Sequence, residues 1–259
     1  MGRAPALLRP EWPAPPRVRS AFSLRSGGVS GPPWDSLNLG IHVGDDPGAV
    51  AQNRRRLREW LALPAEPTWL SQVHGARVAV LGADGSLAAA AAGLPVADAA
   101  VTRLEGVVCA IQVADCLPVL LAARDGSVIG AAHAGWRGLA AGVLEAALAA
   151  LAVPANEVLA WVGPGIGVEH FEVGDEVRAA FLAGAATGRA DPGAAELFHP
   201  NARGRWQCDL HGLARRRLER AGVATVYGER WCTYADASRF FSHRRDGRSG
   251  RMAALIWMA

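Results

Sequence analysis

Lysine is absent from this chain of 259 residues, and all 27 of its basic side chains apart from histidine are arginines. The absence excludes a Schiff-base lysine and a lysine-dependent phosphate loop, so any anion site must use arginine, backbone amides or helix N-termini. The formal net charge is only +3, which is too small to indicate a nucleic-acid partner. No apolar run reaches the roughly 20 residues that a membrane span requires.

The first 20 residues contain no apolar segment of the kind that a secretory signal carries. Cysteine is scarce, with four residues and no Cys-x-x-Cys pair. These features predict a cytoplasmic protein with reduced thiols and no membrane partner. No heptad repeat stands out, so a monomer is expected.

Hydrophobic residues make up 51% of the chain, which is enough to form a globular core. A Pro- and Arg-rich arm is expected over residues 1–19, followed by one α+β domain with mixed sheets over residues 20–259. The Ala-rich segment Leu87–Gly93 fits a loop or a short helix. Apolar periodicity and capping residues predict helices over Asp46–Leu63, Leu139–Leu151, Asp175–Ala183 and Asp209–Ala221. Strands are predicted over Trp69–Val73, Val78–Leu81, Val107–Val113, Leu117–Ala122, Val128–Ala132, Val158–Val162, Ala224–Tyr227 and Ala253–Trp257.

The dipeptide Asp125-Gly126 lies between two apolar runs and predicts a two-residue hairpin. Pairing across this turn places Cys116 opposite Gly135, two residues beyond His133. Diagonal neighbours of this kind share a face and lie roughly 7–8 Å apart. Cys116 and His133 are therefore expected at the open end of the hairpin, at a separation that suits two ligands of one metal.

His74 ends another predicted strand, and with Cys116 and His133 it would form a His2Cys set. Three such ligands and one open position are the pattern of a catalytic zinc site. The same geometry also fits a nucleophile–base pair of Cys116 and His133. A blue-copper centre would need a weak axial methionine, and no methionine is near in the sequence. A multicopper oxidase would need more than the seven histidines present.

Several polar or aromatic residues are candidates for substrate binding. Arg25 lies in a Gly-rich turn over Phe22–Ser30, and Asn38 lies in a loop. Arg137 opens a predicted helix beside free backbone amides that favour anions. Arg244 and Arg248 lie in a Gly- and Arg-rich loop that fits a phosphate or carboxylate clamp.

Together, several motifs resemble the laccase-domain (YfiH-type) family, whose members are regarded as purine nucleoside phosphorylases and were earlier named polyphenol oxidases. The resemblance covers about residues 20–258. The motifs that carry it are Ser71-Gln-Val-His-Gly75, Ala114-Asp-Cys-Leu-Pro118, Ala132-His-Ala-Gly-Trp-Arg-Gly138, Gly163-Pro-Gly-Ile166 and the loop Phe240–Arg251, with Phe22–Ser30 and Trp34–Gly40.

The resemblance implies a four-layer α/β/β/α fold and a zinc ion bound by His74, Cys116 and His133. It also implies phosphorolysis of adenosine, inosine, guanosine and 5′-methylthioadenosine, with hydrolytic deamination of adenosine as a further activity. The substrates would be a purine nucleoside and phosphate. Asp115 is a candidate general acid/base, or a partner that orients a ligand histidine.

Within the same motifs, Gln72 and Phe171 are further candidate substrate contacts, Phe171 by stacking on a ring. Arg137 and Cys116 join Asp115 as candidate catalytic residues. Some members of the family are linked to peptidoglycan editing.

Three rival functions remain open from the sequence. The first is a copper-dependent polyphenol oxidase with Cu2+ in place of Zn2+. The second is a hydrolase that uses Cys116 as nucleophile and His133 as base. The third is a binding module in cell-wall synthesis that binds purines or precursors without turnover.

Overall fold

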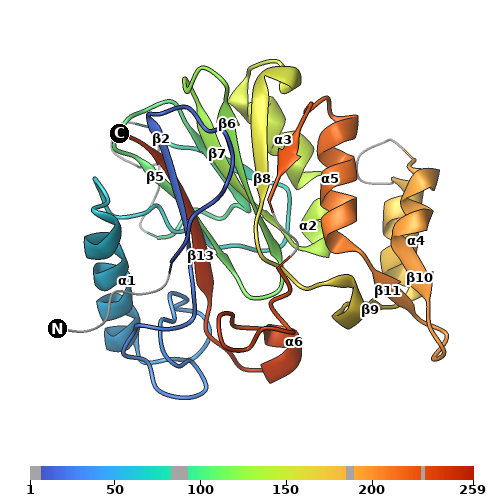
Figure 1. Ribbon diagram of the computed structural model, residues 1–259, viewed down its shortest axis with the longest axis horizontal. Coiled ribbons are helices and arrows are strands. Elements are labelled where there is room, and N and C mark those ends of the chain that lie inside the picture. Colours follow the sequence, from blue (N-terminus) through green and yellow to red (C-terminus); the bar gives the residue numbers. More distant parts are fainter. Residues whose placement is uncertain (1–6, 83–92, 185–189, 229–230) are drawn as a thin grey trace.

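Two sheets packed face to face, with helices on both outer sides, form the body of the protein (Figure 1). The computed structural model describes residues 7–82, 93–184, 190–228 and 231–259. The Ala-rich segment Leu87–Gly93, apart from its last residue, lies outside these ranges. Among the described residues, no helix combines the length and the apolar character needed to cross a bilayer.

The smaller of the two sheets has four strands in the order β1-β2-β13-β5, all antiparallel to their neighbours. One of them, β1, lies within the predicted arm of residues 1–19, and β2 begins at its end. The strands are β1 (Leu7–Leu8), β2 (Val18–Ser23), β5 (Val108–Val113) and β13 (Met252–Met258). The last strand of the chain thus lies between two strands from its first half.

The larger sheet has six strands in the order β12-β8-β6-β7-β4-β3. Its outer pairs, β3 with β4 and β8 with β12, are parallel, whereas the central pairs are antiparallel. The sheet is therefore mixed, as the sequence predicts. Its strands are β3 (Val78–Val80), β4 (Ala99–Thr102), β6 (Leu117–Ala123), β7 (Ile129–Ala134), β8 (Val158–Val162) and β12 (Val226–Tyr227).

Helix α1 (Pro47–Leu61) covers the outer face of the smaller sheet. It begins as predicted: the Asp46 side chain accepts a hydrogen bond from Ala49 N at 2.9 Å, and Pro47 occupies the first turn. The helix buries Val50 and Leu57. Leu57 packs in a cluster with side chains from β2, β5 and β13, so this helix forms the first layer of the fold.

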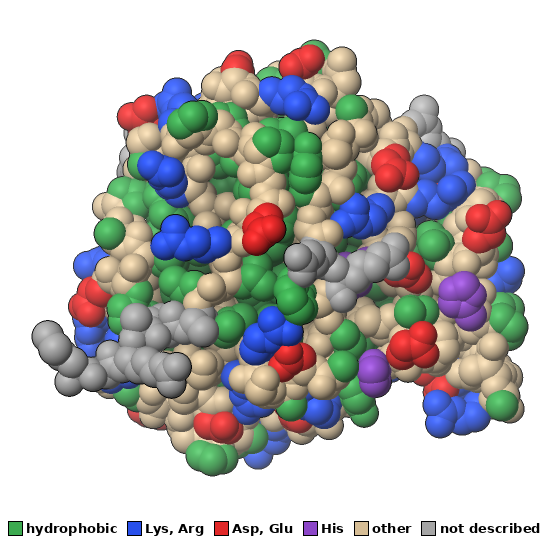
Figure 2. Space-filling model, viewed as in Figure 1, with side chains coloured by type: hydrophobic (Ala, Val, Ile, Leu, Met, Phe, Trp, Pro, Cys, Tyr) green, Lys and Arg blue, Asp and Glu red, His purple; other side chains and the backbone are tan. Residues whose placement is uncertain are grey.

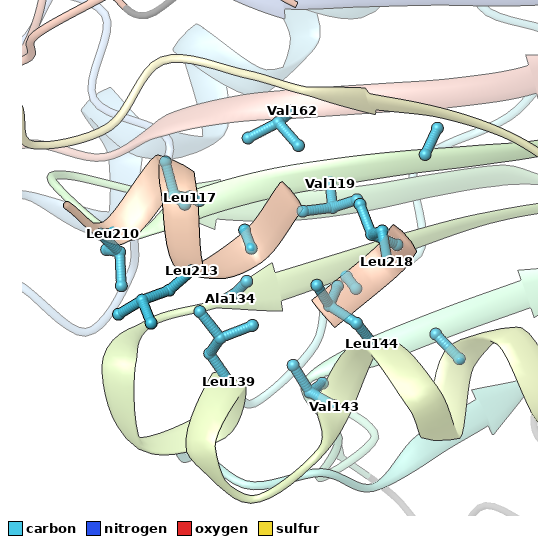
Figure 3. Packing of buried hydrophobic residues seen from close by; sticks show 14 of the residues in the cluster. Leu117, Val119, Ala134, Leu139, Val143, Leu144, Val162, Leu210, Leu213 and Leu218 are labelled. Carbon is cyan, nitrogen blue, oxygen red and sulfur yellow. The ribbon is translucent and has the colours of Figure 1, made fainter. Parts of the chain in front are cut away.

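Helices α2 (Trp136–Ala140), α3 (Val143–Leu151) and α5 (Leu210–Arg220) pack on the side of the larger sheet (Figure 3). The sequence predicts one helix over Leu139–Leu151, but the structure has two. Gly142 adopts φ 90° at the junction, a conformation that glycine permits and that ends the first helix.

Strand β6 shows why the two sheets stack. Val119 and Leu121 face the helices, whereas Leu120 and Ala122 face the smaller sheet. Successive side chains of a strand alternate between faces, and a sheet covered on both sides therefore reads as a continuous apolar run. The four layers α/β/β/α that the resemblance implies are confirmed.

A third, small sheet lies beside α4 (Asp175–Ala183) at the edge of the body, on the right of Figure 1. Its strands are β9 (Glu172–Val173), β10 (Phe198–Pro200) and β11 (Trp206–Cys208), in the order β10-β11-β9. Basic and acidic side chains are interspersed over the face shown in Figure 2. At the lower edge of the body, the short helix α6 (His243–Asp246) precedes β13.

Candidate metal centre and substrate cavity

A cavity of about 430 Å3 opens at the end of the β6–β7 hairpin. This volume is within the range of small-molecule sites. It is lined by the ends of β5 and β7, the loops beside them, the start of α2 and the start of α6. The lining residues are His42, Gln72, His74, Gln112, Val113, Ala114, Asp115, Cys116, His133, Arg137, Ile166, Phe171, His243, Arg244 and Arg251.

The hairpin has the predicted register, in which Leu117 pairs with Ala134 and Pro118 with His133. Cys116 therefore lies opposite Gly135 at the open end. A side chain at Gly135 would clash with the Cys116 thiol, because a Cβ atom there would lie 2.7 Å from Cys116 Sγ. The prediction that Cys116 and His133 meet on one face is confirmed.

His74 completes the cluster, although its backbone differs from the prediction. The expected strand Trp69–Val73 is wrong, since in this stretch Ser71 makes only an isolated bridge to Val96. His74 instead adopts the left-handed conformation with φ 60°, in a turn that directs its ring toward the hairpin. Its Nε2 atom lies 3.8 Å from Cys116 Sγ, and its ring centroid lies 4.7 Å from that of His133.

One donor atom each from His74, Cys116 and His133 lies within 4.8 Å of the others. In a tetrahedral zinc site, a sulfur and a nitrogen ligand at about 2.3 and 2.0 Å from the ion lie roughly 3.5 Å apart. The separation of 3.8 Å between the Cys116 and His74 donors is close to that value. The cluster also faces a cavity, which leaves room for a fourth position. The three residues therefore fit a metal ion.

Asp98, for which the sequence predicts no role, contacts the cluster through the His133 ring and the His74 backbone. Its side chain is fully buried, and its Oδ1 atom lies 2.9 Å from His133 Nδ1. The carboxylate also accepts hydrogen bonds from the backbone N–H groups of Val73, His74 and Gly75. The carboxylate that holds the His133 ring is thus that of Asp98, whereas the sequence proposes Asp115 for such a contact.

Charges within the cluster favour the ionised forms of two ligands. Burial opposes ionisation of Cys116, but His133 and His74 outweigh it and lower the pKa of the thiol to about 6. Burial likewise disfavours the charged imidazole of His133, yet the Cys116 thiolate and Asp98 raise its pKa to about 9. The thiolate that a metal requires is therefore already favoured at neutral pH.

Asp115 adopts φ 89° beside the Cys116 ligand and lines the cavity. Its Oδ1 atom accepts a hydrogen bond from Thr233 Oγ1 at 2.6 Å, and its Oδ2 atom accepts one from Arg244 N at 2.7 Å. The carboxylate thus joins the Cys116 segment to the distant segment that contains Thr233 and Arg244.

Two of the predicted arginines reach the cavity. Arg137 is exposed, its guanidinium lies 4.4 Å from the ring centroid of Trp136, and it makes no hydrogen bond to the described part of the chain. Arg244 donates one hydrogen bond to Glu172 O at 2.9 Å and lies over the Phe171 ring. Both guanidinium groups retain donors for an anion.

Arg25, Asn38 and Arg248 do not line the cavity. Arg25 donates hydrogen bonds to the carbonyl groups of Asp35 and Ala237, and Arg248 lies over the ring of Trp34. The buried Asn38 amide binds the backbone of Gly40 and of Arg251. These side chains hold loops beside the site in place of the direct substrate contacts that the sequence predicts.

Gln72 and Phe171 do line the cavity, as predicted. The Gln72 amide exchanges two hydrogen bonds of 2.8 Å with the backbone of Gln112, so it also joins the His74 loop to β5. Phe171 is largely buried under Arg244. One edge of the cavity wall is therefore aromatic.

Four polar cavity residues are not among the individual candidates predicted from the sequence: His42, Gln112, His243 and Arg251. His243 and Arg251 fall within the Phe240–Arg251 loop that the sequence analysis did recognise. Burial and the charges of Arg251 and Arg54 lower the pKa of His42, so this imidazole is neutral at pH 7. No motif near His42 or Gln112 indicated a role, since the fold alone brings them to the cluster.

Comparison with known proteins places this architecture in a family. Residues 19–259 match the family model described as multi-copper polyphenol oxidoreductase laccase. A Pseudomonas aeruginosa protein named purine nucleoside phosphorylase is 52% identical over 254 residues, which cover 98% of each chain. The Escherichia coli protein named purine nucleoside phosphorylase YfiH is 46% identical over 252 residues, covering 97% of this chain and 98% of the relative.

Solved structures agree with these sequence relatives. A Neisseria meningitidis protein superposes with a TM-score of 0.89 at 45% identity, over 97% of this chain and 98% of its own. YlmD from Geobacillus stearothermophilus gives 0.87 at 32% identity, over 100% and 98%. The expected resemblance is confirmed, and the chain belongs to the laccase-like family of YfiH-type proteins, which carries the multi-copper polyphenol oxidoreductase description.

Proposed function

We propose that the chain is a zinc-dependent purine nucleoside phosphorylase. The observation that carries the proposal is that a His2Cys cluster and arginines with free hydrogen-bond donors line the same cavity. Relatives that match nearly the whole chain are named purine nucleoside phosphorylase. The proposed substrates are adenosine, inosine, guanosine and 5′-methylthioadenosine, each with phosphate.

In phosphorolysis, a phosphate oxygen forms a bond to C1′ of the sugar while the bond from C1′ to the purine nitrogen breaks. The bonding electron pair leaves with the purine, which takes up a proton or a strong hydrogen bond. The 1-phosphate of the substrate's sugar and the free base are the products. The site must therefore hold an anion beside C1′ and supply a donor to the base.

Arg137 and Arg244 are the proposed phosphate ligands, because their guanidinium groups face the cavity with free donors. Such charge-assisted hydrogen bonds are about twice as strong as neutral ones. The guanidinium of Arg251 is less available, because it donates to Ser249 and to Gly250 O. Two arginines on separate short helices, α2 and α6, can fix the orientation of the attacking oxygen.

The leaving purine requires a donor, and His42 and His243 line the same cavity. A neutral imidazole N–H can bind a purine nitrogen as negative charge develops on it. Asp115 accepts a hydrogen bond from the backbone N–H of Arg244 and so positions one of the proposed phosphate ligands. A direct acid/base role for Asp115 is proposed as well.

A zinc ion in the cluster would supply a Lewis acid at the cavity wall. Hydrolytic deamination of adenosine is the second proposed activity. In this reaction water replaces phosphate as the nucleophile. The two reactions act at opposite ends of the nucleoside. They therefore predict two binding orientations, and phosphate should favour one over the other.

The test is to incubate metal-quantified protein with adenosine, with and without phosphate, and to separate the products by chromatography. Adenine and ribose 1-phosphate that form only with phosphate would support phosphorolysis. Inosine formed equally without phosphate would make deamination the main reaction. No turnover of any purine by protein that carries one zinc would refute the proposal.

Two rival functions give different results in the same preparation. A Cys116 hydrolase would stay active without metal and lose activity on alkylation. A copper-dependent phenol oxidase would consume oxygen with a phenol when loaded with copper. Among the described residues, one cluster has three ligand atoms in metal-binding proximity, whereas a multicopper oxidase needs several.

A further inference from the structure

Asp98 links the two histidines of the cluster through a single carboxylate. It lies just before β4, where the pairing of Ala99 with Ala132 places it beside His133 on β7. The backbone confirms this register, because His133 N donates to Asp98 O at 2.7 Å. The two side chains thus project from neighbouring strands onto the same face of the sheet.

The contact with His133 fixes which ring nitrogen is free. Nδ1 of His133 lies 2.9 Å from Asp98 Oδ1, and a carboxylate accepts the hydrogen. The His133 side chain is almost fully buried, so its ring cannot exchange this partner for water. In the neutral imidazole that a metal binds, the proton therefore stays on Nδ1, and Nε2 is the atom available to the metal.

The contact with the His74 loop fixes a backbone that is otherwise unfavourable. His74 adopts φ 60°, a conformation that residues other than glycine adopt at a cost of about 1 kcal/mol or more. Three successive N–H groups, from Val73 to Gly75, donate to the Asp98 carboxylate at 3.2, 2.9 and 2.7 Å. Concave arrangements of backbone N–H groups of this kind bind anions.

We infer that Asp98 is a positioning residue that builds the metal site before metal binds, by orienting His133 and holding the His74 turn with the same carboxylate. This inference rests on the metal site of the proposed function. In this arrangement one buried side chain preforms the site geometry. Cys116 is the proposed ligand that Asp98 does not contact.

The direct test is Asp98→Asn, which keeps the size of the side chain but places an amide where N–H donors converge. Zinc affinity is measured by competition with a chromophoric chelator, and geometry by the absorption spectrum of the cobalt-loaded protein. We expect affinity to fall by about 10- to 100-fold, with a cobalt spectrum that departs from the wild-type one. Equal affinity and an identical spectrum would overturn the inference.

Asp191→Asn is the matched control. Asp191 is also buried, but its carboxylate pairs with Arg216 and Arg220 and touches no metal ligand. We expect this variant to lose thermal stability while its zinc affinity stays that of the wild type. A similar affinity loss in both variants would show a general effect of destabilisation and would overturn the specific role of Asp98.

A second measurement needs no variant and remains decisive if Asp98→Asn does not fold. Amide hydrogen exchange over residues 73–75 is compared in metal-free and zinc-loaded wild-type protein. Protection that is already present without metal is expected, because the carboxylate holds these N–H groups. Protection that arises only with metal would overturn the inference. A wild-type protein that binds no zinc would refute the proposed function. That result is distinct from either hydrogen-exchange outcome.

Discussion

Gly135 provides a way to displace the metal ligands while leaving the sheet intact. It lies opposite Cys116 with φ −69°, so an alanine there would adopt an ordinary backbone conformation. Its Cβ atom would lie 2.7 Å from Cys116 Sγ and 3.1 Å from His74 Cδ2. Favourable contacts between carbon atoms lie at about 3.5–4.0 Å. The new methyl group therefore forces these two ligands to move by up to about 1 Å.

Such a movement is large for a metal site, in which ligand distances hold within about 0.2 Å. We expect Gly135→Ala to weaken zinc binding by at least tenfold, which corresponds to about 1.4 kcal/mol. The assay is chelator competition, with thermal unfolding as a check on the fold. Loss of the glycine N-cap of α2 adds at most about 1 kcal/mol of destabilisation.

Gly31→Ala is the matched control, because a Cβ atom at Gly31 meets no atom within 4 Å. This variant should bind zinc as the wild type does. If Gly135→Ala also binds zinc with wild-type affinity and the protein remains folded, the cluster that contains Cys116 and His74 is not the metal site.

Three further predictions follow from single contacts. Arg137→Ala should raise the KM for phosphate by roughly ten- to hundredfold with little change in stability, since a charge-assisted hydrogen bond contributes about 1.5–3 kcal/mol; an unchanged KM would exclude Arg137 from the anion site. Arg25→Ala should instead lower the melting temperature and leave that KM unchanged, because its guanidinium binds loop carbonyl groups. The Arg216 and Arg220 guanidinium groups hold the pKa of Asp191 below its usual range, so the stability they contribute is complete above about pH 4 and is lost as the pH falls further. The difference in unfolding free energy between wild type and Asp191→Asn should therefore be constant from pH 7 to 5 and shrink below pH 4; a constant difference down to pH 2 would contradict it.

The sequence predicts that Cys116 and His133 come together, because a local turn signal determines their pairing. The Asp125-Gly126 turn sets the register of β6 and β7, and register decides which side chains share a face. The long apolar strands and capped helices likewise carry their own signals. The break at Gly142 was missed because an Ala- and Leu-rich run favours a continuous helix.

The remainder of the site depends on contacts that no local pattern encodes. Asp98 reaches His133 only because β4 pairs with β7, and nothing in the residues around Asp98 distinguishes it from a surface aspartate. Arg25 and Arg248 have the residue type of an anion site, but tertiary packing directs them to carbonyl groups and a tryptophan ring. Residue type predicts chemistry, whereas long-range pairing decides which residue performs it.

We propose that one zinc ion in the His74, Cys116 and His133 cluster supports phosphorolysis in the adjoining cavity. The most direct measurement titrates metal-free protein with zinc and follows phosphate-dependent release of adenine from adenosine. Activity that rises to a plateau at one zinc per chain, and that Cys116→Ala abolishes together with zinc binding, is the predicted result. Full turnover by metal-free protein, or by Cys116→Ala, would contradict the account.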